Sequence, residues 1–277
     1  MEKEAAAADF WAFVILRQQA YWQHRSKQGP PYSQDQAIAR FHFCNVYREA
    51  DRGTIWFHEH CTGETLAHTL FSSLVYRTIN RIDTFDAWGG IPTPATIDRF
   101  LGFIIERMAK GGKVFTGRHL TTGVKSYHKL VDHITVGNGL DDLAADIENA
   151  TSLKQVVKRL IKVPGIGAFF GWQVACDLVE AGVLPQAVWL TVDDWVQLGP
   201  GAARGAKLIA PDDDVVTTAK WLLESQPVDG LLVPPASAPG SFTLKNVEHA
   251  LCEYVRWKRA SDTDVKNVGL EVREWAK

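Results

Sequence analysis

Residues 160–178 read "LIKVPGIGAFFGWQVACDL", and this stretch decides the fold that the sequence predicts. Two glycines, Gly165 and Gly167, flank one aliphatic residue, and an apolar, helix-like run follows them. Glycine adopts backbone angles that other residues avoid, and it lets the backbone approach a ligand closely. The stretch therefore fits a tight turn between two helices, either as an ordinary corner or as a hairpin whose backbone amides hold an anion.

The flanks of the turn favour a hairpin that binds the DNA backbone. The upstream helical pattern is basic and carries Lys154, Lys158, Arg159 and Lys162. The second helix begins directly after the turn, so its unpaired N–H groups and its positive dipole end point outward, where a phosphate can bind. We predict a helix-hairpin-helix over about residues 153–181. Its DNA contacts are predicted at Lys162, Gly165, Ile166 and Gly167.

Helical patterns dominate the rest of the chain as well. We predict one all-α domain over residues 1–277, with two helical lobes and a cleft between them. Ser33 is placed to cap a long helical run that continues to residue 60. The caps expected for later helices are Thr62 or Thr65, Thr151 or Ser152, and the "APDDD" of residues 210–214. Only residues 114–124 have a strand-like composition.

Composition narrows the classes of function. A net charge of -2 argues against a protein that binds nucleic acid through non-specific electrostatics, although it leaves room for a local basic face. No apolar run approaches the ~20 residues of a membrane span, and no signal peptide is visible. We therefore expect a cytoplasmic protein with reduced thiols and no membrane partner. The nearest group of metal ligands is "FHEHC", with His58, His60 and Cys61, but no second group accompanies it, so no metal site is predicted.

A second constellation joins two carboxylates to a glycine-rich segment. Asp193 and Asp194 precede "GPGAARG" at residues 199–205. A carboxylate at the mouth of a cleft can act on an extruded nucleotide, and a glycine loop with an arginine can hold a phosphate. The plain alternative is that an aspartate caps a helix and that the glycines end one. Residue chemistry alone does not separate the two readings.

Two further motifs place polar residues within largely apolar helical patterns. In "RFHFCNVYREADRGT", residues 40–54, helical spacing would place Asn45, Arg48 and Arg52 on one face, with Asp51 nearby; a solvated face is the alternative. In "NVEHALCEY", residues 246–254, a buried Glu248 opposite Arg48 would form a charge-assisted pair. Cys252 has no obvious base to activate it as a nucleophile, so a small core residue is the simpler interpretation.

The four motifs, in this order, resemble the α-glutamyl/putrescinyl thymine pyrophosphorylase family. Its members are DNA-glycosylase-like helical proteins of phages with hypermodified thymine, and they are related to the helical domain of 5-hydroxymethyluracil DNA kinases. The resemblance extends from about Phe10 to Arg259. The kinase P-loop pattern GxxxxGK[ST] does not occur in these 277 residues.

The resemblance implies a reaction on double-stranded DNA that carries a modified thymine. An amino acid or a polyamine would displace pyrophosphate from 5-(pyrophosphoryloxymethyl)uracil, with the base flipped out of the stack. The cell would be a phage-infected bacterium. A glycosylase that excises a modified pyrimidine and a non-catalytic DNA-binding module remain alternatives, and the sequence names neither the amine nor the DNA context.

The resemblance also assigns roles to residues. Asp194, or failing that Asp193, would be the general base or electrostatic stabiliser. The pyrophosphate would be received by Arg48, Gly199, Gly201 and Arg204, and the pocket would be lined or braced by Asn45, Asp51, Gln173, Asp177 and Glu248. A glycosylase with a lysine nucleophile would carry it just after the hairpin, where this chain has Phe169, Phe170 and Gly171. We expect no cofactor, although the hairpin could hold a monovalent cation; a divalent metal requirement is left open.

Overall fold

The computed structural model describes residues 2–61, 63–116, 123–227, 232–236 and 240–262, together with Val272. Across these residues the chain forms fourteen α-helices and one short 3-10 helix, η1. Extended pairing among them is limited to an isolated bridge between Phe41 and Val272. The all-α prediction is therefore confirmed for the described part of the chain. None of the helices described there is long and apolar enough to cross a membrane.

The contacts divide the chain into two compact units. Unit 1 is Met1–Asp51 with Asp193–Lys277, and unit 2 is Arg52–Val192. The predicted single domain and the predicted cleft between two lobes stay predictions.

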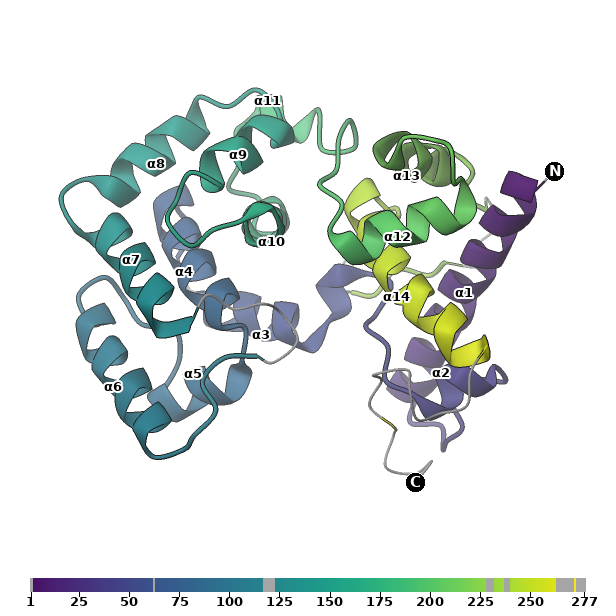
Figure 1. The fold of residues 1–277 in the computed structure, drawn as a ribbon, viewed down its shortest axis with the longest axis horizontal. Helices are drawn as coiled ribbons and strands as arrows, with labels where there is room; N and C mark the ends of the chain where they lie inside the picture. The colour runs from purple at the N-terminus through teal and green to yellow at the C-terminus, as the bar shows by residue number, and fades with distance from the viewer. Residues whose placement is uncertain are drawn as a thin grey trace. The chain divides into compact units, whose positions relative to one another are not determined.

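Unit 1 is built around its last helix. Its elements are α1 (Glu2–Arg25), α2 (Gln36–Arg40), η1 (Arg48–Ala50), α12 (Pro200–Ile209), α13 (Val215–Glu224) and α14 (Leu244–Asp262). Helix α14 packs against α1, α12 and α13 (Figure 1). One face of α14 is apolar, and its residues Leu244, Val247 and Leu251 are completely buried. Asp214 caps α13 by accepting hydrogen bonds from two backbone N–H groups, as predicted.

The glycine-rich segment at 199–205 is not a loop, and this prediction is wrong. Gly199 is the N-cap of α12 and Pro200 is its first residue, a position that suits the fixed φ of proline. The glycines that follow allow α12 and α14 to approach closely. A Cβ added to Gly205 would lie 2.5 Å from the carbonyl oxygen of Leu251, and one added to Gly201 would lie 2.5 Å from the Cys252 sulfur.

The long helix predicted from Ser33 to residue 60 is also wrong. Asp35, not Ser33, caps α2, which ends at Arg40. The chain then runs extended, with the aromatic rings of Phe41 and Phe43 buried and His42 between them exposed. Burial of alternate residues is the pattern of an extended segment, so tertiary packing overrides the local helical pattern.

Unit 2 contains nine helices within the described residues. They are α3 (Arg52–His60), α4 (Leu66–Ile79), α5 (Ile82–Trp88), α6 (Ile97–Ala109), α7 (Gly123–Thr135), α8 (Gly139–Glu148), α9 (Leu153–Leu160), α10 (Ala168–Glu180) and α11 (Gln186–Trp189). Thr65 and Ser152 cap α4 and α9, so one of each predicted pair is confirmed. Helix α10 packs against α4 and α9 (Figure 1). Thr62 and residues 117–122 of the strand-like stretch lie outside the described residues.

Candidate functional site

The opening motif forms the turn between α9 and α10 in unit 2. Gly165 has a φ of +82°, a backbone angle that favours glycine, and an added Cβ there would lie 3.3 Å from the carbonyl oxygen of Ser126. Gly167 is the N-cap of α10 and has no side chain to satisfy the first N–H groups of that helix. Two helices joined by a glycine turn are thus present as predicted; DNA contact by this turn stays a prediction.

The residues of the turn differ in their exposure to solvent. Gly167 and Lys162 are exposed, as are Lys154 and Lys158 on α9. Ile166 is buried, so only its backbone can face a ligand. A phosphate at this turn would therefore meet backbone N–H groups and lysine side chains.

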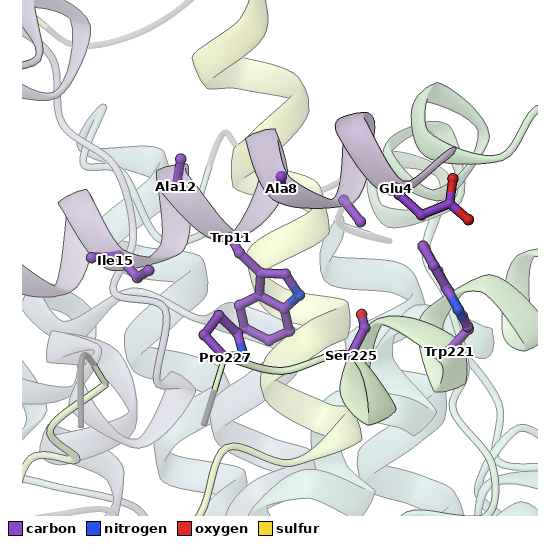
Figure 2. Close-up of a pocket in the computed structure, with 9 residues that line it drawn as sticks. Glu4, Ala8, Trp11, Ala12, Ile15, Trp221, Ser225 and Pro227 are labelled. Carbon is purple, nitrogen blue, oxygen red and sulfur yellow. The ribbon is translucent and has the colours of Figure 1, made fainter. Parts of the chain in front are cut away.

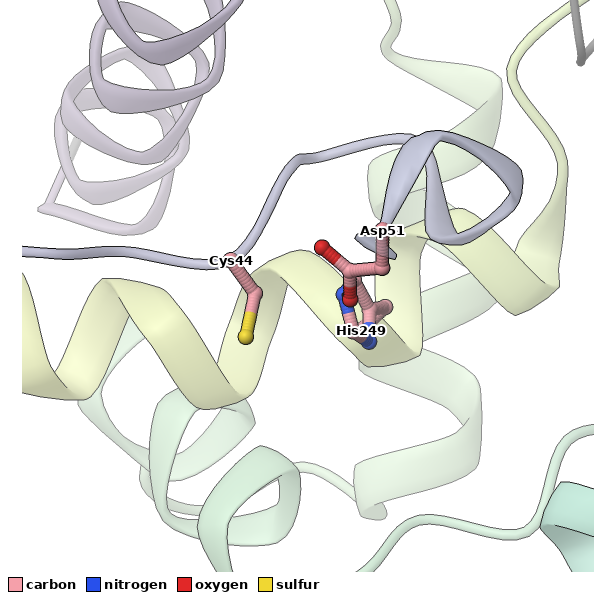
Figure 3. A group of neighbouring side chains, drawn as sticks. All are labelled: Cys44, Asp51 and His249. Carbon is pink, nitrogen blue, oxygen red and sulfur yellow. The ribbon is translucent and has the colours of Figure 1, made fainter. Parts of the chain in front are cut away.

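In unit 1, the segment 42–51 lies against α14 and brings several predicted site residues together (Figure 3). We call this group the α14 polar centre; it consists of Cys44, Asn45, Arg48, Asp51, Glu248, His249 and Glu253. The segment 42–51 and α14 are far apart in the sequence, so the packing of α14 creates the group.

Hydrogen bonds fix the turn that carries Asn45 and Asp51. Arg17 on α1 donates to the carbonyl oxygen of Phe43 at 3.1 Å and to Asn45 Oδ1 at 2.6 Å. The Asn45 backbone N–H donates to Asp51 Oδ1 at 2.8 Å, and its side-chain amide donates to the carbonyl of Ala50 at 2.6 Å. The prediction that Asn45 and Asp51 lie close together is therefore right, but a turn and not a helix face joins them.

The second carboxylate oxygen of Asp51 faces α14. Asp51 Oδ2 lies 2.9 Å from His249 Nε2. Burial would raise the pKa of Asp51, but the neighbouring His249 and the Asn45 N–H lower it. Burial would lower the pKa of His249, but Asp51 and then Glu248 and Glu253 raise it. The two side chains thus favour each other's charged forms.

Cys44 completes this corner of the centre. Its backbone N–H donates to Glu253 Oε2 at 2.9 Å, and Glu253 in turn pairs with Arg256. Burial, and then Asp51 and Glu253, raise the pKa of the Cys44 thiol well above its ordinary value. The free side chain is therefore a neutral thiol near pH 7.

The residues expected to receive pyrophosphate come from η1 and the start of α12 in unit 1. Arg48 and Glu248 are both buried, at 2% and 5% exposure. Glu248 Oε1 accepts a hydrogen bond from the Gly199 N–H at 3.4 Å, which ties α14 to the first turn of α12. Arg204 lies on α12 and is exposed. These residues belong to one unit, and pyrophosphate binding by them stays a prediction.

Asp193 and Asp194 differ in their surroundings. Asp193 Oδ1 accepts a hydrogen bond of 2.7 Å from the backbone N–H of Leu244, the first residue of α14. Asp193 therefore caps α14, a helix distant in the sequence, and does not N-cap a short helix that follows it in the sequence. Both aspartates are exposed. A catalytic role for either carboxylate stays a prediction.

Gln173 and Asp177 lie on α10, in unit 2. Asp177 is fully buried and accepts hydrogen bonds from Arg77 Nε at 2.7 Å, Arg77 Nη2 at 2.6 Å and Ser73 Oγ at 2.5 Å. Both of its oxygens are engaged, so Asp177 joins α10 to α4. Pocket roles for both residues stay predictions.

The "FHEHC" residues do not converge on one point. His58 Nε2 lies 3.1 Å from Glu180 Oε2, whereas the His60 ring stacks on Trp56 and its Nδ1 lies 2.8 Å from the Trp56 carbonyl oxygen.

The interpretation of Cys252 as a nucleophile is weakened, because burial and then Glu253 and Glu248 raise its pKa to about 12.

A groove of about 430 Å³ lies between α1 and α13 (Figure 2). Its lining is Glu4, Ala7, Ala8, Trp11, Ala12, Ile15, Trp221, Ser225 and Pro227. Most of these side chains are apolar, and the one charged residue among them is acidic. The groove therefore does not suit a pyrophosphate or a DNA backbone.

The predicted site residues did not include Cys44 or His249, although His249 lies within the motif "NVEHALCEY" that the sequence analysis singled out. Cys44 is a lone cysteine within an aromatic stretch. His249 is about two hundred residues away in the sequence, and only folding brings the two together. The alternation of Phe41 and Phe43 is the one local signal that could have placed Cys44 on an extended segment and not on a helix.

Comparison with known proteins places this all-helical chain in a family. The chain belongs to the family described as "5-hmdU DNA kinase, helical domain", which it matches over residues 4–267. A 5-hmdU DNA kinase of Bacillus phage SP10 is 25% identical over 240 residues, which cover 74% of this chain and 36% of that protein. The chain thus spans about a third of the length of this curated relative. No solved structure matches the chain.

Proposed function

We propose that this protein acts in the hypermodification of thymine in phage DNA and transfers an amino acid or a polyamine onto 5-(pyrophosphoryloxymethyl)uracil. The observation that carries the proposal is the family match over residues 4–267, because the relative that shares it is named as a kinase of 5-hmdU in DNA. Phosphorylation turns the 5-hydroxymethyl group into one that a nucleophile can displace. A helical domain of the same family would use that activated base.

In the proposed reaction, the amine nitrogen forms a bond to the 5-methylene carbon and the carbon–oxygen bond to pyrophosphate breaks. Pyrophosphate leaves with the electron pair, and the amine gives up a proton to a general base. Asp194 is that base: both aspartates are exposed, but the backbone N–H of Leu244 already engages Asp193.

The leaving group would be held by unit 1. Buried Arg48, the N-terminus of α12 at Gly199 and Gly201, and exposed Arg204 supply positive charge and backbone N–H groups. Glu248 and Asn45 would brace this arrangement through their hydrogen bonds to Gly199 and Ala50. In unit 2, the turn at Gly165–Gly167 would hold a phosphate of double-stranded DNA.

The reaction is tested with DNA that contains pyrophosphorylated 5-hydroxymethyluracil and a mixture of amino acids and polyamines. After digestion to nucleosides, mass spectrometry should detect a new aminomethyl nucleoside, and pyrophosphate should be released in equal amount. An abasic site would overturn the proposal in favour of a glycosylase. DNA that is bound but unchanged would overturn it in favour of a binding module.

Asp194→Ala should lower turnover by roughly 10²- to 10⁴-fold, the contribution of a positioned acid or base, and leave DNA affinity unchanged. Asp193→Asn is the matched control, because an amide oxygen can still cap α14 and turnover should persist. Full turnover by Asp194→Ala would remove this residue from the mechanism.

Gly167→Ala tests the DNA contact separately. An added Cβ meets no atom within 4 Å, and Gly167 has a φ of −84°, so the fold should tolerate alanine. The Cβ would keep a phosphate away from the first N–H groups of α10, and losing one charge-assisted hydrogen bond should weaken DNA binding roughly tenfold or more. Fluorescence anisotropy with labelled duplex measures this. Gly102→Ala on α6 is the control; equal affinities for both variants would contradict the contact.

A further inference from the structure

Three potential metal ligands meet in the α14 polar centre. Cys44 comes from the extended segment after α2, Asp51 from the end of η1 and His249 from α14 (Figure 3). One ligand atom of each residue lies within 4.8 Å of the others, and each residue is half-buried. A thiolate, an imidazole and a carboxylate are the three side-chain ligands of protein-bound zinc.

The spacing is close to that of a single coordination sphere. Zn–N and Zn–O bonds of about 2.0–2.1 Å and a Zn–S bond of about 2.3 Å place tetrahedral ligand atoms about 3.3–3.6 Å apart. His249 Nε2 and Asp51 Oδ2 are 2.9 Å apart, and the thiol lies within 4.8 Å of both. Small side-chain rotations would therefore place all three around one ion.

The contact between His249 and Asp51 supports a shared cation. His249 Nε2 is buried, and within the described residues it forms no hydrogen bond, although Asp51 Oδ2 is only 2.9 Å away. The nitrogen is thus close to the oxygen but is not directed at it. When His249 is protonated the two groups form an ion pair, and when it is neutral a cation shared by the nitrogen and the oxygen would take the place of the proton.

The surrounding residues already hold the ligands in place. Asp51 Oδ1 accepts the Asn45 N–H, which leaves Oδ2 to face the ion, and the Cys44 backbone is held by Glu253. Such outer hydrogen bonds orient metal ligands in proteins. Binding would release the thiol proton of Cys44, and one thiolate and one carboxylate would balance the two charges of the ion.

We propose that Cys44, Asp51 and His249 bind one divalent cation of the zinc class and leave a coordination position open. Structural zinc sites use four protein ligands, whereas three protein ligands leave room for an exogenous one. If the proposed function holds, an oxygen of the leaving pyrophosphate takes that position, since a Lewis acid stabilises the charge that develops on it. Metal binding itself does not depend on that reaction.

A second trio, His58, Asp177 and Glu180 in unit 2, has similar spacing but different partners. Arg77 already neutralises Asp177 with two hydrogen bonds, so a metal ion would meet a fixed positive charge. This trio therefore serves as the internal control.

The experiment uses the whole chain after dialysis against a chelator, titrated with Co²⁺ and then with Zn²⁺. We expect one Co²⁺ per chain, with the near-ultraviolet charge-transfer band of a cobalt–thiolate bond, and displacement of Co²⁺ by Zn²⁺. Cys44→Ser should abolish the band. His249→Ala should lower the zinc affinity by at least about 100-fold, and Asn45→Ala, which loosens only the supporting turn, by about tenfold. His58→Ala should bind as the wild type does.

Circular dichroism confirms that each variant is folded, and Asp51→Asn provides a further conservative test of the same ligand set. Metal binding that is equal in wild type, Cys44→Ser and His249→Ala would overturn the proposal, and so would Co²⁺ binding without the thiolate band. Because binding is measured without DNA or amine, an ion held by an inactive protein would refute the proposed function alone. Amine transfer at full rate by metal-free protein would refute the proposed use of the ion.

Discussion

Two groups of three potential metal ligands, one in each unit, differ in what balances the charge of their aspartate. In unit 2, Asp177 meets Arg77 and Ser73, and its charge is balanced by a side chain of the protein. In unit 1, Asp51 meets His249 and Cys44, and the balancing charge is a proton or an ion. Arg77 bonds directly to Asp177 and makes that carboxylate structural. Arg17 also acts on Asp51 electrostatically, but it donates its hydrogen bonds to Phe43 and Asn45, which leaves Asp51 Oδ2 able to bind something exchangeable.

The largest effect is expected when the arginine of this comparison is removed. Arg77→Met should leave Asp177 as a buried, uncompensated charge and lower the free energy of unfolding by about 3–5 kcal/mol. Urea denaturation measures the loss. Arg77→Met combined with Asp177→Asn should recover much of it, because the charge is then absent; a single variant as stable as the wild type would contradict the structural role of the pair.

The framework of the other trio is tested at the contact between α12 and α14. Gly205→Ala places a Cβ 2.5 Å from the Leu251 carbonyl oxygen, which is backbone and cannot rotate away. The helices must separate, and we expect a loss of about 1–3 kcal/mol on thermal unfolding, together with weaker metal binding at His249. Gly102→Ala is the matched control; its added Cβ meets no atom within 4 Å, and it should stabilise α6 by up to about 1 kcal/mol. Equal stability of the two variants would refute the close contact.

The smallest effect is expected at Cys252, the second thiol near the α14 polar centre. With a pKa of about 12, only roughly one thiol in ten thousand is ionised at pH 8, so alkylation by iodoacetamide should be far slower than for a free cysteine. Peptide mass spectrometry over time measures the rate. Cys252→Ser should leave amine transfer unchanged. Rapid labelling of Cys252, or lost turnover in the serine variant, would restore it as a candidate nucleophile.

Local signals in the sequence were sufficient for several helices. The caps Thr65, Ser152 and Asp214 and the glycine turn at 165–167 are written in a few adjacent residues, so spacing alone finds them. The errors fall where distant packing decides. Phe41 and Phe43 lie on an extended segment and not on a helix, because their rings are buried within unit 1. The ring centroid of Phe43 lies 6.0 Å from that of Phe13 on α1.

The candidate site was predicted unevenly for the same reason. Asn45, Asp51, Arg48 and Glu248 were singled out, and the structure places all four in one unit. Asp177 looked equally suited to a pocket, but its partner Arg77 is on another helix, and no motif joins the two. Cys44 lacked any sequence neighbour that marks a ligand.

The sequence by itself determined the helical class, the capped starts of several helices, the glycine turn and the set of polar residues in four ordered motifs. These depend on backbone preferences and on side chains within a few residues of one another. Only the tertiary structure decided that Asp193 caps α14, that Asp177 is neutralised by Arg77, and that Cys44, Asp51 and His249 meet. A charge or a lone pair acquires its role from the groups within a few ångströms of it, and in this protein those groups are brought there by folding.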